Sequence, residues 1–314
     1  MVPDLERELA LPHPLDLHRT LGPLRQGRRD PAMRIEGGVV WRASRTPQGA
    51  VTARLRVDAR SARLVARAWG DGAAWALEHL PELIGASDEP AELLTRLTGR
   101  SPSRQHADDV VLALAQRLTG LRIPRSRAVL EATVPVVLAQ KVTGLEAKRS
   151  YRELVTALGS PAPGPGRLTV PPDAATLAST PSWVWHRFGV ERKRAEIVVG
   201  AAAAHRRLEE AVDLSAADAR RRLRALPGIG PWTAAEVAIV ALGDADAVSI
   251  GDFHLPNQVS WALAGEARGD DTRMLELLEP YRGHRGRVLR LLGAGGVIAP
   301  RFGPRTEVRS FRYR

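Results

Sequence analysis

Hydrophobic and polar positions alternate along parts of the first hundred residues. Residues 51–57 read Val-Thr-Ala-Arg-Leu-Arg-Val and residues 63–69 read Arg-Leu-Val-Ala-Arg-Ala-Trp. A period of two is typical of a strand that buries one face. The polar stretch 58–61 supplies a turn between the two segments, and helical patterns flank them at 15–24 and 73–84. This part of the chain predicts a small α+β domain with an antiparallel sheet.

From about residue 107 onward, the spacing of the apolar residues becomes that of helices. The pattern predicts helices at 128–142, 148–158, 192–212, 216–226, 231–242 and 286–292, with others starting near residues 174 and 252. Residues 160–172 are rich in proline and glycine and predict a loop within the helical part. We therefore expect an N-terminal α+β domain at residues 1–112 and an all-helical region at residues 113–314. The arginine-rich tail, residues 301–314, is expected to be a solvated end.

One short block within the helical part has the features of a ligand-binding turn. Residues 226–234 read Leu-Pro-Gly-Ile-Gly-Pro-Trp-Thr-Ala. Gly228 and Gly230 leave room for a close approach, and Pro231 suits the first position of a helix. Backbone N–H groups at such a turn can hold a phosphate. The alternatives are an ordinary helix–helix turn and a turn that grips DNA without catalysis.

A lone acid follows this hairpin at Asp252, within Ser-Ile-Gly-Asp-Phe-His-Leu. Aspartate is a favoured helix N-cap, so capping alone explains an acid at a helix start. Its position about twenty residues after the hairpin, beyond one intervening helix, favours a second role. A carboxylate there could face the molecule whose phosphate the hairpin holds.

The amino-acid composition limits which partners and which kinds of site the protein can have. The 314 residues carry a formal net charge of +11 and are 44% hydrophobic, which allows two or three packed domains. The positive charge suits a polyanion such as DNA, and it equally suits a compositional bias towards arginine. The absence of cysteine excludes disulfides, thiolate zinc sites and iron–sulfur clusters held by cysteine. No secretory signal or apolar span is visible, so we expect a cytoplasmic protein with no membrane partner.

Four further segments extend the pattern beyond the hairpin. They read Gly-Leu-Arg-Ile-Pro at 120–124, Leu-Ala-Gln-Lys-Val-Thr at 138–143, Phe-Gly-Val-Glu-Arg-Lys-Arg-Ala at 188–195 and Pro-Tyr-Arg-Gly-His-Arg at 280–285. With the hairpin block and the aspartate after it, they resemble the helix–hairpin–helix DNA glycosylases of the HhH-GPD superfamily, in particular the 3-methyladenine DNA glycosylase II (AlkA) branch. Residues 13–22 resemble the start of the TBP-like N-terminal domain of that branch. The resemblance implies an α+β domain followed by a mostly α helix–hairpin–helix region, whose two lobes flank an active-site cleft.

The resemblance implies that Asp252 is the catalytic residue of a DNA glycosylase. Hydrolysis of an N-glycosidic bond passes through a transition state close to an oxocarbenium ion, which a nearby carboxylate stabilises. Family members that also cut the DNA strand carry a lysine where this chain has Trp232, and an indole forms no Schiff base. The resemblance therefore implies a monofunctional enzyme without AP lyase activity, which starts base excision repair by removing alkylated purines of the 3-methyladenine type.

The resemblance also assigns the residues of a pocket for the damaged base, which must be flipped out of the duplex. These residues are Trp232, Glu236, Phe253 and His284. Trp232 would stack on the flipped base, and Glu236 lies one turn further on the same helix face. Glu236 and His284 stand where better-known members carry aromatic residues, so we treat both as groups that could contact the base. The alternatives are a core position for Trp232 and a rim or surface position for Glu236 and His284.

The contacts to DNA implied by the resemblance centre on the hairpin. They comprise Gln140, Lys141, Gly228, Ile229, Gly230, Thr233 and Arg285. Lys141 stands where relatives insert an apolar plug into the DNA, and a lysine could instead reach a phosphate or a base edge. The backbone carbonyls of Arg224, Leu226 and Ile229 are implied to hold a monovalent cation, with no other cofactor and no iron–sulfur cluster.

Two other functions stay open at this point. One is a glycosylase for deaminated bases or bulky alkyl adducts, which Glu236 and His284 keep possible. The other is a non-enzymatic damage-recognition protein that binds DNA through the hairpin, in which Asp252 would be only a helix cap. For the main function and for both alternatives, we expect the partner to be double-stranded DNA with damaged bases. We expect the protein to be a monomer that is located in the cytoplasm, at the nucleoid.

Overall fold

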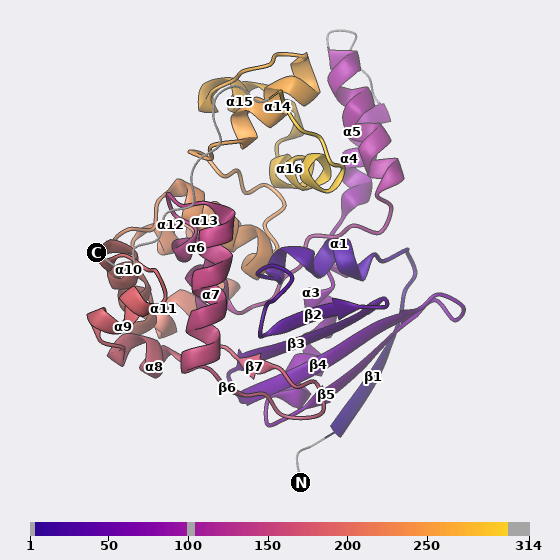
Figure 1. Cartoon of the computed structure of the whole chain (residues 1–314). Helices are drawn as coiled ribbons and strands as arrows, with labels where there is room; N and C mark the ends of the chain where they lie inside the picture. Colours follow the sequence, from indigo (N-terminus) through magenta and orange to yellow (C-terminus); the bar gives the residue numbers. More distant parts are fainter. Residues whose placement is uncertain (1–3, 99–103, 301–314) are drawn as a thin grey trace.

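The computed structural model describes residues 4–98 and 104–300 (Figure 1). The tail at 301–314 lies outside the described residues. Within them, the buried apolar side chains form three large clusters and a small fourth one. One cluster belongs to the N-terminal sheet and two belong to helices, so the molecule has three packed parts.

The N-terminal part is a five-stranded antiparallel sheet. Its strands are β1 (Asp4–Ala10), β2 (Met33–Glu36), β3 (Val39–Thr46), β4 (Gly49–Asp58) and β5 (Arg63–Trp69), in the order β1-β5-β4-β3-β2. Helices α1 (Leu17–Leu21), α2 (Ala73–Glu78) and α3 (Leu80–Leu83) and the 3₁₀ turn η1 (Gly22–Leu24) accompany it. Leu64, Ala66 and Ala68 of β5 are fully buried, as the period of two predicts. The α+β expectation is therefore confirmed, while the TBP-like character stays a prediction.

The second part, which we call the hairpin lobe, is helical and surrounds the largest core. Its helices are α6 (Val129–Leu138), α7 (Gly144–Leu158), α8 (Ala174–Ser179), α9 (Ser182–Arg187), α10 (Arg192–Ala203), α11 (His205–Glu209), α12 (Ala216–Arg224) and α13 (Pro231–Val237), with the 3₁₀ turn η3 (Glu210–Asp213) and the π-helical turn η4 (Ala238–Leu242). The predicted helices 192–212 and 231–242 are thus each divided into shorter pieces. Within 160–172, the expected loop contains the two short strands β6 (Ser160–Pro161) and β7 (Thr169–Val170), and β7 packs on β3.

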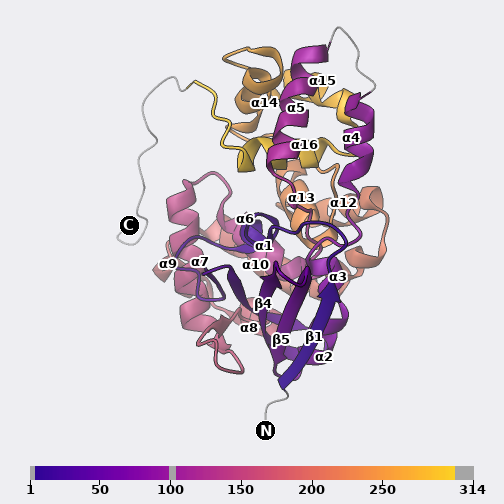
Figure 2. The ribbon, with the colours of Figure 1, turned by 90° about the vertical axis from the view of Figure 1, so that its right-hand side faces the viewer.

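The third part, the second lobe, combines helices from two distant stretches of sequence. They are α4 (Pro90–Thr98), α5 (Gln105–Arg117), α14 (Leu255–Ala264), α15 (Asp271–Leu278) and α16 (Arg285–Ala294), with the 3₁₀ turn η5 (Glu279–Tyr281). Figure 2 shows α4 and α5 beside α14–α16, in agreement with the contacts of α5 with α14 and α16. The division at residues 112 and 113 stays a prediction, and α5 runs through this position.

A connecting segment leads from the hairpin lobe to the second lobe. The polypeptide leaves the hairpin lobe after η4 and enters the second lobe at α14, so residues 243–254 form the connection. In the described residues, no helix is both long and apolar enough to cross a lipid bilayer.

Candidate active site

The glycine hairpin lies between α12 and α13, as the sequence pattern predicts. Gly228 has a φ of +83°, and a Cβ added there would come within 2.3 and 2.4 Å of side-chain carbons of Ile197. Gly230 precedes the first turn of α13 in an extended conformation, and a Cβ added there would meet nothing within 4 Å. Gly228 is therefore required by the fold, whereas the space beside Gly230 is open to a ligand.

The carboxylate of Asp252 makes hydrogen bonds on both oxygens. Oδ1 accepts the backbone N–H groups of His254 at 2.7 Å and Leu255 at 2.9 Å, at the start of α14. Oδ2 accepts the indole N–H of Trp232 at 2.9 Å, from α13. All three partners are donors, which suits an ionised carboxylate because it only accepts hydrogen bonds. Asp252 thus caps α14 in the second lobe and at the same time reaches the hairpin lobe.

The turn that carries Asp252 is fixed by a second carboxylate, which the sequence analysis did not identify. The backbone N–H of Gly251, a residue with a φ of +88°, donates to Oδ1 and Oδ2 of Asp271 at 3.1 and 3.0 Å. Asp271 is the first residue of α15, and an acid in the first turn of a helix is explained by the helix dipole alone. Only the three-dimensional contact reveals that Asp271 positions the turn before Asp252.

Glu236 joins the same turn from α13. Its Oε1 accepts a short hydrogen bond from the hydroxyl of Ser249, whose carbonyl in turn accepts the backbone N–H of Asp252 at 3.3 Å. Burial raises the pKa of the Glu236 carboxyl and the charge of Asp252 raises it further, while the Ser249 hydroxyl and Arg290 act in the opposite direction. The structure therefore brings Trp232, Glu236 and Asp252 together.

The other two expected pocket residues lie differently. Phe253 is 81% exposed, directly beside Asp252. His284 is 5% exposed; its Nδ1 accepts from Arg287 Nε at 3.2 Å and its Nε2 lies 3.3 Å from a Glu92 carboxylate oxygen. Burial and the charge of Arg287 lower the pKa of His284. His284 lines a cavity of about 250 Å³, to which Asp252, Trp232 and Glu236 do not contribute. The structure therefore does not bring His284 to Asp252.

The expected plug loop lies between α6 and α7 and is attached to the hairpin. The side-chain amide of Gln140 donates to the carbonyl of Gly228 at 3.1 Å and to the hydroxyl of Thr233 at 2.9 Å. Lys141, the next residue, is exposed and has a φ of +56°. Gln140 and Thr233 thus hold the loop on the hairpin and leave Lys141 free to project from it.

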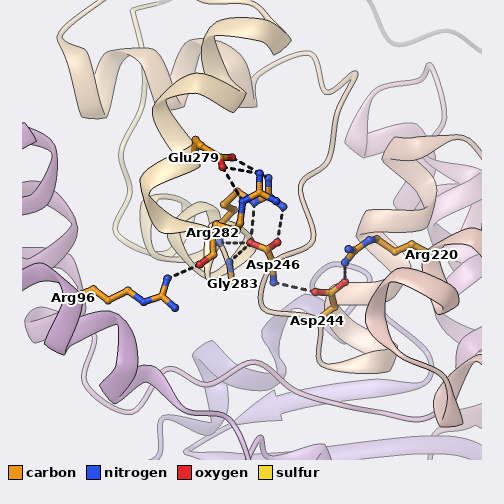
Figure 3. A network of polar contacts seen from close by, with 8 residues as sticks. Arg96, Arg220, Asp244, Asp246, Glu279, Arg282 and Gly283 are labelled. Carbon is orange, nitrogen blue, oxygen red and sulfur yellow. Dashed lines mark hydrogen bonds and ion pairs between the residues drawn. The ribbon is translucent and has the colours of Figure 1, made fainter.

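Arg285, an expected DNA contact, is occupied within the protein. Its Nε and Nη2 donate to the two carboxylate oxygens of Asp246 at 2.8 and 2.5 Å. Asp246 also accepts the backbone N–H of Gly283 at 2.7 Å, and its own N–H donates to Asp244, which pairs with Arg220 (Figure 3). Arg285 therefore ties the start of α16 to the connection between the lobes.

The possible cation site at the hairpin consists of backbone atoms. The carbonyl of Leu226 accepts the N–H of Ile229 at 3.1 Å, which leaves one of its lone pairs for another partner. Among the described residues, no group of three or more histidine, aspartate or glutamate side chains is arranged to hold a metal ion. A cation at the hairpin stays a prediction.

Comparison with known proteins supports the resemblance inferred from the motifs. No family model matches the chain. A probable bifunctional transcriptional activator/DNA repair enzyme AlkA of Mycobacterium tuberculosis is 34% identical over 166 residues, which is 48% of this chain and 30% of that protein. The chain thus spans less than a third of the curated relative it matches.

Solved structures share the fold over nearly the whole chain. A 3-methyladenine DNA glycosylase from Archaeoglobus fulgidus has a TM-score of 0.77 at 20% identity, covering 91% of this chain and 97% of its own. An 8-oxoguanine glycosylase/lyase from Clostridium acetobutylicum has a TM-score of 0.69 at 12% identity, covering 93% and 98%. The chain thus has the fold of these two DNA glycosylases, and over about half of its length it is similar in sequence to the AlkA protein named above.

Proposed function

We propose that this protein is a monofunctional DNA glycosylase that hydrolyses the N-glycosidic bond of alkylated purines of the 3-methyladenine type. The observation that carries the proposal is the position of the Asp252 carboxylate. It lies between the hairpin lobe and the second lobe, fixed on one side by Trp232 and on the other by the start of α14. A residue that only capped α14 would not need the contact with Trp232.

In this proposal, the chemistry at Asp252 is electrostatic. As the bond between C1′ and the base nitrogen breaks, positive charge develops on the sugar, and the fixed carboxylate stabilises it. Water then adds to C1′ and an abasic site remains. An alkylated purine is already cationic and leaves as a neutral base, so Asp252 can suffice for such a substrate.

Trp232 is the reason to propose hydrolysis without strand cleavage. The fold alone does not separate the two activities, because its neighbours include both a 3-methyladenine glycosylase and an 8-oxoguanine glycosylase/lyase. Strand cleavage through a Schiff base requires an amine, and the indole of Trp232 has none. Its N–H is moreover engaged with Asp252.

Double-stranded DNA is the proposed partner, bound through the hairpin. The open space beside Gly230 admits a phosphate to the N-terminal end of α13. Lys141 projects from the loop that Gln140 holds on this hairpin, where it would reach the DNA backbone or the gap left by the flipped base. A monovalent cation on the carbonyls of Arg224, Leu226 and Ile229 would strengthen the attraction for the phosphate.

The test compares the wild type with Asp252→Asn on duplexes that carry methylated, deaminated or oxidised bases. We expect the wild type to release methylated purines and to leave the strand intact until alkali is added. Asp252→Asn should lose ~10²–10³ in the single-turnover rate while it binds the DNA as tightly as the wild type. Released base and strand breaks are measured separately.

A control separates catalysis from helix capping. Asp173 accepts the backbone N–H of Thr176 at the start of α8 and has no part in the site, so Asp173→Asn should retain the wild-type rate. Undiminished turnover by Asp252→Asn would remove Asp252 from the mechanism, whereas no base release by the wild type on any of the duplexes would favour the non-enzymatic DNA-binding function. Strand breaks without alkali would contradict the monofunctional assignment.

A further inference from the structure

Helix α13 makes two parallel contacts with the turn at residues 249–252. The first joins the indole of Trp232 to Asp252, and the second joins the carboxyl of Glu236 to the hydroxyl of Ser249. Trp232 and Glu236 are four residues apart on one helix face, so their side chains lie one turn from each other. Ser249 and Asp252 are three residues apart in a turn closed by a backbone hydrogen bond. Two carboxyl groups therefore share one small region at the junction of the lobes.

We propose that Glu236 is a second catalytic residue, which donates a proton to a departing neutral purine while Asp252 stabilises the sugar. The proposal rests on the glycosylase function proposed above and deepens it, because it extends the substrates to purines that carry no positive charge. It also assigns different tasks to the two carboxyl groups.

The environment of Glu236 suits a proton donor. The groups that face it are the Ser249 hydroxyl and the Asp252 carboxylate on the turn and the Arg290 guanidinium on α16. Ser249 and Arg290 favour the ionised form, but burial and Asp252 outweigh them and raise the pKa. Arg290 is itself buried, which lowers its pKa to about 10, so it stays cationic at neutral pH. Glu236 thus carries its proton up to a higher pH than an ordinary glutamate does.

The requirement for a proton depends on the charge of the base. When the bond between C1′ and N9 breaks, its electron pair stays on N9. A methylated cationic purine then leaves neutral, whereas a neutral purine would leave as an anion unless a ring nitrogen gains a proton. In the proposed step, Glu236 gives the proton on its Oε2 to N3 or N7 of the base and becomes a carboxylate. Water forms the new bond to C1′ and loses a proton to solvent, and Glu236 takes up a proton from solvent.

The experiment measures single-turnover rates of the full chain and of Glu236→Gln on two duplexes, one with hypoxanthine and one with 7-methylguanine. We expect the ratio of the hypoxanthine rate to the 7-methylguanine rate to fall ~10²-fold in Glu236→Gln. In the wild type, the hypoxanthine rate should fall as the pH rises through the raised pKa of Glu236, and the 7-methylguanine rate should show no such decrease. The glutamine variant should lack this pH dependence.

Two further variants make the result specific. Ser249→Ala removes a hydrogen bond that favours ionised Glu236, so the decrease in the hypoxanthine rate should move to higher pH. Glu276→Gln, an exposed change on α15, should behave as the wild type in both assays. If the wild type releases 7-methylguanine but its hypoxanthine rate and pH profile do not respond to Glu236→Gln, the inference is wrong and the proposed function stands. If the wild type releases 3-methyladenine but neither of these two bases, the inference is wrong and the proposed function stands. If it releases none of the three, the proposed function itself fails.

Discussion

At the scale of single residues, one carboxylate serves two helices. Asp252 uses Oδ1 for the backbone of α14 and Oδ2 for the indole of Trp232 on α13. Each oxygen is fixed by a donor, so the charge has a defined position before any substrate binds. Such preorganisation is what electrostatic stabilisation of a transition state requires.

The indole N–H is the part of this arrangement that can be removed alone. Trp232→Phe keeps an aromatic ring in the site and leaves Oδ2 without its donor. A hydrogen bond to a charged group contributes ~1.5–3 kcal/mol, so we expect the single-turnover rate on a methylated purine to fall about tenfold or more. DNA affinity, measured by fluorescence anisotropy, should stay near that of the wild type. A rate equal to that of the wild type would show that Trp232 does not position Asp252.

The residue scale also shows where prediction from the sequence ends. The hairpin motif and its distance to Asp252 led to the three residues that the structure brings together, Trp232, Glu236 and Asp252. His284 was placed with them by its position in a motif, but its ring lies against Glu92 and Arg287. Asp271 and Ser249 were missed, because their roles arise from contacts between segments that local patterns do not encode.

At the scale of elements, the two hairpin glycines perform different tasks. Gly228 has a positive φ and a neighbour, Ile197, that leaves no room for a Cβ, whereas Gly230 has open space beside it. Substitution by alanine should therefore affect a different property at each position, the stability of the fold at Gly228 and the binding of DNA at Gly230.

We expect Gly228→Ala to destabilise the protein by roughly 1–3 kcal/mol, through backbone strain and contact with Ile197. Gly230→Ala should unfold at the wild-type denaturant concentration but bind DNA more weakly, because the added methyl group occupies the space proposed for a phosphate. Chemical unfolding and DNA titration of both variants test this pair. Wild-type DNA affinity of Gly230→Ala would argue against the hairpin as a DNA contact.

The sequence predicts a helix or strand well where the spacing of apolar residues within that element determines its structure. Strands β4 and β5 alternate and were expected, whereas the edge strand β1 was not. Glu6 and Glu8 of β1 form ion pairs with Arg67 and Arg63 of β5. The strand therefore forms because it pairs with β5, and its own apolar pattern does not predict it. The assembly of α4 and α5 with α14–α16 likewise depends on contacts between distant parts of the chain.

At the scale of the whole molecule, a buried ion pair joins helix α16 of the second lobe to the segment that leads from the N-terminal part into that lobe. Arg287 of α16 donates through both terminal nitrogens to Asp88, which follows α3, and Nη1 lies 2.8 Å from Oδ2. The same oxygen accepts the backbone N–H of Ile123 at 2.9 Å. Their side chains are 3% and 7% exposed, so the loss of one partner leaves the other as a buried charge without its counter-ion.

Removing one partner of this pair should therefore cost much more than removing both. We expect Arg287→Met to destabilise the protein by ~3–5 kcal/mol, and Asp88→Asn in the same chain to recover part of the loss. Urea unfolding followed by circular dichroism measures both. Arg273→Met, which removes an exposed pair with Glu266, should leave the unfolding midpoint nearly unchanged. An equally small effect of Arg287→Met would mean that this pair does not hold α16 on the segment between α3 and α4.

The hydrogen bond between Trp232 and Asp252 has a mechanical consequence. Its donor belongs to a helix of the hairpin lobe, and its acceptor belongs to the turn that opens the first helix after the connection. At 2.9 Å, a separation of the lobes by about 1 Å would break it, because N–H···O hydrogen bonds span about 2.7–3.2 Å between their heavy atoms. The bond therefore forms only at one separation of the lobes, and both oxygens of Asp252 keep their donors only at that separation.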